Sequence, residues 1–350
     1  KNNGTILNPS YEYETSDFLK TLDFYSDTSP VLSDIDNDGD QDLFIGTEID
    51  YSTFPFRGRI KFFENIGNLT EPYFDLIDPY FLGTNIGTNL CPELIDIDND
   101  NDNDMFIGEW NGKIKYYENV GNAENFDFNY LGELEAISET GILDIIDLSG
   151  RSAPRFIDID NDNDFDLFIG TVNGLITFYE NTGTVEEYEF TFITNSFNQI
   201  NVIKNAKPEF IDMDLDTDFD LIVGSESNNI HYYRNIGDTF NPNFVIDSSY
   251  EFIAGQNLSP TSSSLFNSNQ IDIFLGLSTG GLYHIKSDLC IQGDINNDQI
   301  INIEDIIIIV DIILDGNNYN QNLLCQADLY FDNMIDIFDI ILIIEQILGF

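Results

Sequence analysis

The chain repeats a short pattern in which aspartates alternate with other residues and are followed by an apolar run. In the copy "FIDIDNDNDFDLFIG", which begins at Phe156, aspartate holds every second position from Asp158 to Asp166. An aromatic segment, "ITFYEN", comes next, and a further alternating segment, "EYEFTFI", follows it. Short alternating segments rich in aromatic and β-branched residues are typical of β-strands. The pattern therefore predicts short strands around an acidic loop.

The same unit occurs five times, which indicates a repeat protein. Four copies keep the acidic loop, and a fifth around "LFNSNQIDIFLGL" keeps the frame but loses most acids. The first aspartates of the four acidic copies are 62, 62 and 54 residues apart, at Asp34, Asp96, Asp158 and Asp212. Each unit offers four short strands, and four-stranded units repeated around an axis are characteristic of a β-propeller. We therefore expect a mainly β fold with five blades over residues 1–288.

The ends of the repeat array indicate how it closes. An open solenoid is the competing architecture for such repeats. The segment "YEYETSDF" from Tyr11 resembles the fourth strand of a unit, yet it precedes the first acidic loop. We expect it to pair with "LYHIK" of the last unit and thereby to join the two ends of a ring.

The carboxylates of the acidic loops repel one another and need a cation to offset this repulsion. The chain has 13 Lys and Arg against 63 Asp and Glu, a formal charge of -50, so basic side chains cannot neutralise the loops. Carboxylates about 5 Å apart would repel by about 3 kcal/mol at an effective dielectric constant of about 20. A hard divalent cation can offset this repulsion. The same charge argues against nucleic acids and anionic membranes as partners.

The spacing within each loop favours calcium. Carboxylates stand at positions 1, 3, 5 and 9, and position 7 can offer its carbonyl, which is close to the oxygen spacing of a calcium loop. Position 6 must allow a tight curl, and it is held by Gly39, Asn101, Asn163 and Thr217. A β-branched residue tolerates left-handed geometry poorly, so the loop of Asp212 should bind most weakly. The candidate ligands are Asp34, Asp36, Asp38, Asp40, Asp42, Asp96, Asp98, Asp100, Asp102, Asp104, Asp158, Asp160, Asp162, Asp164, Asp166, Asp212, Asp214, Asp216, Asp218 and Asp220.

These loops, with the "DLFIG" that follows them, resemble the FG-GAP or VCBS repeats of integrin α-subunit propellers and of many secreted bacterial proteins. The resemblance covers the five repeats. It implies that the loops bind calcium and stabilise the blades rather than catalyse a reaction. Integrin propellers have seven blades, whereas this chain has five units. The fifth loop has Ser264, Phe266 and Ser268 at ligand positions, so we expect no ion there.

From Cys290 the chain becomes rich in isoleucine and carries two further acidic loops, "DINNDQIINIED" and "DLYFDNMIDIFD", each followed by an apolar run. This duplication resembles a dockerin module, in which paired calcium loops each precede a helix, although propensity alone would make the isoleucine runs strands. The resemblance implies an α-helical docking domain over residues 289–350. Its implied ligands are Asp294, Asn296, Asp298, Ile300, Asn302, Asp305, Asp328, Asp332, Met334, Asp336 and Asp339. Gln299 and Tyr330 depart from the pattern.

Cys290 and Cys325 precede the two tail loops at equivalent places in the duplication, which favours a disulfide bond between them. Such a bond would close a loop of about 35 residues and stabilise the fold by about 3 to 4 kcal/mol in the chain-entropy model. Free buried thiols are the alternative.

No segment carries the signature of a catalytic site. His231 and His284 lie in aromatic strands, where a packed imidazole is the ordinary interpretation. The sequence has no nucleophile elbow, zinc-protease motif or phosphate-binding glycine loop. Trp110 and aromatic pairs such as Tyr116 and Tyr117 could stack on sugar rings, but such pairs more often belong to a core. We therefore expect no enzymatic activity.

The chain begins at Lys1 without a leader, and no apolar run is long enough to span a membrane, which we interpret as an exported bacterial or archaeal protein. The favoured function is a secreted, non-catalytic, calcium-binding propeller for adhesion or extracellular assembly. It would dock through its tail on a cohesin-like receptor or another copy. Two alternatives stay open: a self-assembling filament in which the tail of one copy binds the propeller of the next, and a polysaccharide-binding or polysaccharide-degrading component of a dockerin-cohesin complex.

Overall fold

The computed structural model describes residues 24–288 except 25, 52–53, 55, 68–71, 215, 248–251, 254–255 and 264–269, and residues 293, 295–296, 301–314, 326–327, 329 and 334–348. The chain divides into two compact units. The larger unit comprises residues 14–213 and 217–287, and the smaller one comprises residues 1–13, 214–216 and 288–350.

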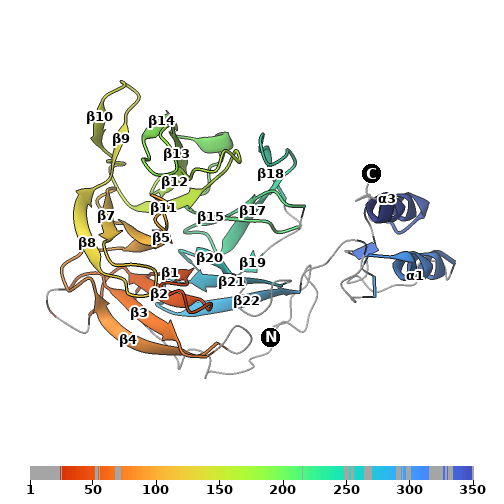
Figure 1. Cartoon of the computed structure of the whole chain (residues 1–350), viewed down its shortest axis with the longest axis horizontal. Coiled ribbons are helices and arrows are strands. Elements are labelled where there is room, and N and C mark those ends of the chain that lie inside the picture. The colour runs from red at the N-terminus through yellow and green to blue at the C-terminus, as the bar shows by residue number, and fades with distance from the viewer. Residues whose placement is uncertain are drawn as a thin grey trace. The chain divides into compact units, whose positions relative to one another are not determined.

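Five β-sheets make up the larger unit and succeed one another around a common centre (Figure 1). The first sheet holds β1 (Thr28–Ser33), β2 (Asp42–Thr47), β3 (Ile60–Asn65) and β4 (Phe74–Phe81). The second holds β5 (Cys91–Ile95), β6 (Asp104–Gly108), β7 (Ile114–Asn119) and β8 (Phe128–Glu133). In each, neighbouring strands pair antiparallel in chain order.

The remaining sheets repeat this order with additions. The third holds β11 (Ser152–Ile157), β12 (Asp166–Thr171), β13 (Ile176–Asn181) and β14 (Phe190–Thr194), and its outer edge takes on β9 (Glu135–Ile137) and β10 (Leu143–Ile145). The fourth holds β15 (Lys207–Ile211), β16 (Asp220–Gly224), β17 (Asn229–Asn235), β18 (Phe244–Ile246) and β19 (Phe252–Ile253). The fifth holds β20 (Ser259–Ser263), β21 (Gln270–Gly276) and β22 (Leu282–Asp288). The expected mainly β propeller of five blades is confirmed.

A glycine near the end of each second strand explains how closely the blades approach one another. A Cβ atom on any of these glycines would lie only 2.1 to 2.3 Å from a backbone carbonyl oxygen at the start of the next blade's first strand. It would also lie 2.7 to 2.8 Å from a proline two residues further along that strand. The pairs are Gly46 with Pro92, Gly108 with Pro154, Gly170 with Pro208, Gly224 with Pro260, and Gly276 with Pro30. The last pair joins the fifth blade to the first, so the ring is closed.

The core lies between the blades. The second strand of the first four blades is buried along its whole length, as expected for a continuous apolar run. Each hydrophobic cluster of the larger unit joins two neighbouring blades, and the cluster of Phe274 with Leu43 and Ile45 again joins the fifth blade to the first. The predicted strand from Tyr11 lies outside the described residues, as do the ligand positions of the fifth loop.

In the smaller unit, α1 (Ile303–Leu314) and α3 (Ile337–Leu348) each follow a tail loop and contribute Ile309 and Ile343 to one apolar cluster. Each helix begins with a capping box. Asn302 Oδ1 accepts the Glu304 N–H while Asp305 Oδ2 accepts the Asn302 N–H, and Asp336 and Asp339 repeat this arrangement. The caps explain why isoleucine runs form helices here, but two short helices do not confirm a dockerin module.

None of the described helices is long and apolar enough to cross a membrane. Cys91 is buried as a free thiol, whereas Cys290 and Cys325 lie outside the described residues, so their pairing stays a prediction.

Candidate functional site

The inner strands of the first four blades have an acidic loop at one end and a different set of polar residues at the other. In the first blade β1 begins directly after Asp27 and ends directly before Asp34, the first residue of the acidic loop. The strand has six residues, which separates its ends by about 20 Å at 3.3 Å per residue. The acidic loops therefore lie at one end of the inner strands, and the residues that precede these strands lie at the other.

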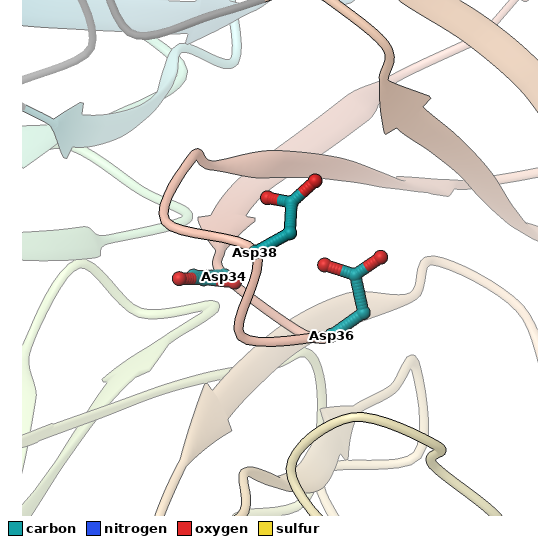
Figure 2. Close-up of side chains that lie close together, drawn as sticks. All are labelled: Asp34, Asp36 and Asp38. Carbon is teal, nitrogen blue, oxygen red and sulfur yellow. The ribbon is translucent and has the colours of Figure 1, made fainter.

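Each acidic loop brings three carboxylates together. Asp34, Asp36 and Asp38 offer oxygen atoms that lie within 4.8 Å of one another, and Figure 2 shows the three side chains on a single tight turn. The equivalent groups are Asp96, Asp98 and Asp100; Asp158, Asp160 and Asp162; and Asp212, Asp214 and Asp216. Positions 1, 3 and 5 of the predicted ligand sets thus converge in all four loops.

The backbone reaches this geometry through left-handed residues at position 6. The φ angles are +94° at Gly39, +71° at Asn101, +77° at Asn163 and +78° at Thr217. The first aspartate holds the turn, since Asp158 accepts the backbone N–H groups of Asp162 and Asn163. The predicted curl at position 6 is confirmed, and Thr217 adopts it although left-handed geometry costs an L-residue about 1 to 2 kcal/mol.

The residue at position 7 contributes a side-chain carboxylate, whereas the sequence analysis considered mainly its backbone carbonyl oxygen as a ligand. Asp40 is 9% exposed, and its Oδ1 atom is buried without a hydrogen bond in the described part of the chain. Burial, followed by the charges of Asp38, Asp36 and Asp34, raises the pKa of Asp40 to about 6. Asp102 and Asp164 have the same environment and the same shift. A buried carboxylate beside three others is a favourable ligand for a cation.

Position 9 has a different environment. Asp42 Oδ1 accepts the backbone N–H of Asn65 at 2.8 Å, and the side chain of Asn65 in turn accepts the N–H groups of Gly67 and Tyr73. The same bond from the end of the third strand reaches Asp104, Asp166 and Asp220. Burial is the main cause that raises the pKa of Asp42 to about 7. The position-9 aspartates therefore fasten the second strand to the third.

The tail loops are described only in part. Asp305 Oδ1 accepts the N–H groups of Ile295 and Asn296, and Asp339 is fully buried at the start of α3. Asn296, Asn302, Met334 and Asp336 are also described. The other predicted tail ligands, Asp294, Asp298, Ile300, Asp328 and Asp332, lie outside the described residues.

At the opposite end of the inner strands, five equivalent positions carry polar residues that sequence analysis did not select: Asp27, Asn89, Arg151, Asn205 and Asn257. Asn205 donates to Asn257 Oδ1 at 3.0 Å, and Asn257 donates to Asp27 Oδ2 at 3.1 Å. Arg151 reaches across from the third blade and donates to Asp27 Oδ2 at 3.2 Å. These five residues are termed the axial ring below, and hydrogen bonds link all of them except Asn89.

Two further side chains extend the axial ring. Arg151 also donates to Glu48 Oε1 at 2.9 Å, so two carboxylates share its guanidinium group. The same guanidinium lies 4.7 Å from the ring centroid of Trp110, whose side chain is 54% exposed. Burial, and then the charge of Asp27, raises the pKa of Glu48, while Arg151 opposes the shift. The ring thus combines an aromatic platform with two carboxylates in unequal environments.

Beneath the ring, an ion-pair cluster crosses the axis. Arg155 of the third blade donates to Glu93 of the second, to Glu209 of the fourth at 2.6 Å and to the Pro260 carbonyl of the fifth at 3.2 Å. Arg155, Glu93 and Glu209 are all buried. Such a cluster links four blades and contributes positional order more than net stability.

The two histidines do not form a catalytic group with the axial ring. His284 stacks on Phe274 and contacts Asp272 at 2.6 Å, while burial lowers the pKa of His231, which lies near Ser225 and Ser227. Both environments agree with the packed imidazoles that the sequence indicated.

Comparison with known proteins finds structural matches of low sequence identity. No protein-family model matches the chain, and no curated protein matches it. A glycosyl hydrolase from Bacteroides ovatus is similar at a TM-score of 0.48 and 11% identity, covering 78% of this chain and 90% of its own. A GH43_1 enzyme from Xanthomonas citri matches at 0.47 and 8%, covering 77% and 89%. A lectin from Burkholderia pseudomallei matches at 0.41 and 9%, covering 76% and 96%.

The comparisons bear on two expectations. The sequence indicated a non-catalytic propeller for adhesion or assembly, whereas the similar structures are named as glycoside hydrolases and lectins. The comparisons do not support the expectations of an adhesion function and of no enzymatic activity, and both are withdrawn. The axial residues come from separate repeats and are adjacent only in the folded ring, so no local motif in the sequence marks them.

Proposed function

We propose that this protein acts on a polysaccharide, which it binds at the axial ring and hydrolyses there. The observation that carries the proposal is the sharing of one guanidinium by Asp27 and Glu48 beside the half-exposed Trp110. Aromatic faces and planar polar groups are the usual lining of ligand sites, and paired carboxylates are the usual catalytic groups for glycosidic bonds.

The two carboxylates suit different roles. Glu48 has a raised pKa and a side chain that is 28% exposed, so it is our candidate general acid. Asp27 accepts hydrogen bonds from Arg151 and Asn257, which hold its carboxylate in place, so it is our candidate base or nucleophile. Glycoside hydrolysis requires one carboxyl group to donate a proton while the other remains charged.

Calcium would hold the blades in shape from the other end of the inner strands. Four loops each gather three carboxylates, and in the first three loops position 7 adds a buried oxygen without a hydrogen bond among the described residues. Oxygen ligands of this number and charge suit calcium, and magnesium would retain more waters. When bound, the ion would offset the repulsion within each loop.

The smaller unit would attach the protein to a partner as a dockerin-like module. Its helices expose apolar side chains that a soluble protein rarely leaves uncovered, including Ile303 at 68%, Leu314 at 78% and Ile337 at 64%. A protein receptor of the cohesin type would fit the proposed role in a polysaccharide-degrading complex outside the cell.

To test this, a panel of purified polysaccharides is incubated with the calcium-loaded full chain, and hydrolysis is measured as the release of reducing ends. Glu48→Gln and Asp27→Asn should each lower kcat by about 10² to 10⁴-fold, the usual contribution of a positioned acid or base. Glu133→Gln is the matched control, because Glu133 is also a partly exposed glutamate in an ion pair, with Lys113. Equal activity in all three variants would remove Asp27 and Glu48 from the mechanism, and no turnover or binding on any glycan would refute the function.

A further inference from the structure

Within the described part of the chain, Lys207 in the axial region forms no ion pair with a carboxylate. Four other lysines do pair with a carboxylate: Lys61, Lys113, Lys115 and Lys204. Lys207 is 7% exposed, and the one hydrogen bond that its ammonium makes within the described chain is to Ser29 Oγ at 2.8 Å. A buried ammonium without a counter-ion is costly, and it is most unexpected in a chain of formal charge -50.

Lys207 lines a small pocket at the axial ring, together with Asn89, Arg151, Asn205, Cys91 and Thr171. Asn89 is 7% exposed, and its side-chain amide makes no hydrogen bond to the part of the chain that the structure describes. Asn205 contributes a buried Oδ1 atom without a hydrogen bond there. Counting only partners in the described chain, the pocket gathers an ammonium without a carboxylate, an amide without a hydrogen bond and one unsatisfied acceptor.

The carboxylates nearest the pocket are engaged by other cations. Asp27 and Glu48 both pair with Arg151. Glu93 and Glu209 both pair with Arg155. Burial, with Arg151 and Arg155 in addition, lowers the pKa of Lys207, while Asp27 and Cys91 oppose the shift. A ligand carboxylate would restore the charged form and satisfy the Asn89 amide in the same contact.

We propose that this pocket binds the carboxylate of a uronic acid, so that the polysaccharide recognised at the axial ring is an acidic one. The inference rests on the proposed function and adds the class of its substrate. Trp110 and Arg151 would hold the sugar ring, Lys207 and Asn89 would hold its carboxylate, and Asn205 Oδ1 would accept a bond from a neighbouring hydroxyl group.

The test uses the fluorescence of Trp110, the one tryptophan in the chain, in the full calcium-loaded protein at low ionic strength. An oligogalacturonide is titrated against its methyl ester, which has the same sugar rings without the charge. The acid should bind at least about tenfold more tightly, since a hydrogen bond to a charged group contributes about 1.5 to 3 kcal/mol. Lys207→Met should abolish this preference, and Lys204→Met, whose ion pair is exposed, should keep it.

A second readout guards against a folding defect. Removing an unpaired buried charge is expected to maintain or raise the Tm of the ligand-free protein, so Lys207→Met should melt no lower than the parent. Asn89→Leu should lower affinity for the acid several-fold and leave the ester unaffected. Equal binding of acid and ester by the parent chain would overturn this inference and leave the proposed function intact. Binding of neither would overturn both.

Discussion

The two ends of the inner strands differ in how similar the residues are from one repeat to the next. At the acidic end, four blades carry the same aspartates in the same positions, and all four loops converge on a cluster of the same geometry. At the axial end, the equivalent positions hold Asp27, Asn89, Arg151, Asn205 and Asn257, and all of these except Asn89 join one asymmetric hydrogen-bond network.

The difference indicates what each end is for. A site that recurs in four of the five blades would serve a need that these blades share, which here is to fasten a strand connection whose carboxylates repel one another. The axial residues differ from blade to blade, so they cannot play the same structural role in every blade. A ligand without fivefold symmetry requires a binding site that also lacks it. Repetition therefore points to stability and departure from repetition to recognition.

The largest expected effect comes from removing calcium. Each site should stabilise the fold by about 2.7 kcal/mol when free calcium is 100 times its Kd, so stripping four sites should lower the Tm by tens of degrees. Calorimetry in calcium, in magnesium and in chelator measures this. A Tm that does not respond to calcium would refute the metal assignment and with it the contrast between the two ends.

Single substitutions at the two ends should differ in their cost. Asp158→Asn removes one charge from a cluster and weakens two backbone hydrogen bonds, so in calcium it should lower the free energy of unfolding by about 1 to 3 kcal/mol. Glu48→Gln should change it by less than about 1 kcal/mol, because partly exposed ion pairs contribute little. Urea titration of both variants measures the difference, and equal costs would show that the axial ring is also structural.

Among the acidic loops, the residue at position 6 should determine which loop is most stable and which binds calcium most weakly. Thr217→Gly should stabilise the protein by about 1 kcal/mol, because a β-branched residue is released from a left-handed φ of +78°. Asn163→Thr should destabilise the third loop by a similar amount. Calcium titrations followed by thermal melting measure both, and opposite signs would refute the prediction that the loop of Asp212 is the weakest.

The smallest effect is a pH dependence that calcium should reverse. Without the ion, the folded-state pKa values of Asp40 and Asp42 are raised to about 6 and about 7 from 3.8, so the folded protein binds more protons than the unfolded chain. Stability in chelator should therefore fall as the pH rises from about 4 to 7. In calcium the loops require ionised carboxylates, so stability should instead rise over the same range. Melting series in the two buffers measure this.

Much of the fold could be predicted because it depends on short sequence patterns that recur along the chain. The five units, the strands after each loop and the curl at Asn101 and Asn163 follow from residue type and period alone. The site at the axial ring could not be predicted in this way. One signal was available, since Arg151 stands where other units have Asn or Asp, but a single departure in a repeat has no meaning until its neighbours in space are known.

The number of blades and the clustering of carboxylates at positions 1, 3 and 5 could be predicted from the sequence alone, because they depend on residues close together in the chain. Only the tertiary structure decided that position 9 fastens two strands, that Arg155 links four blades and that Asp27, Glu48 and Lys207 face one axis. The longest of these contacts join residues more than 100 positions apart, as between Arg151 and Asp27. Ring closure brings them together, and no local pattern records that proximity.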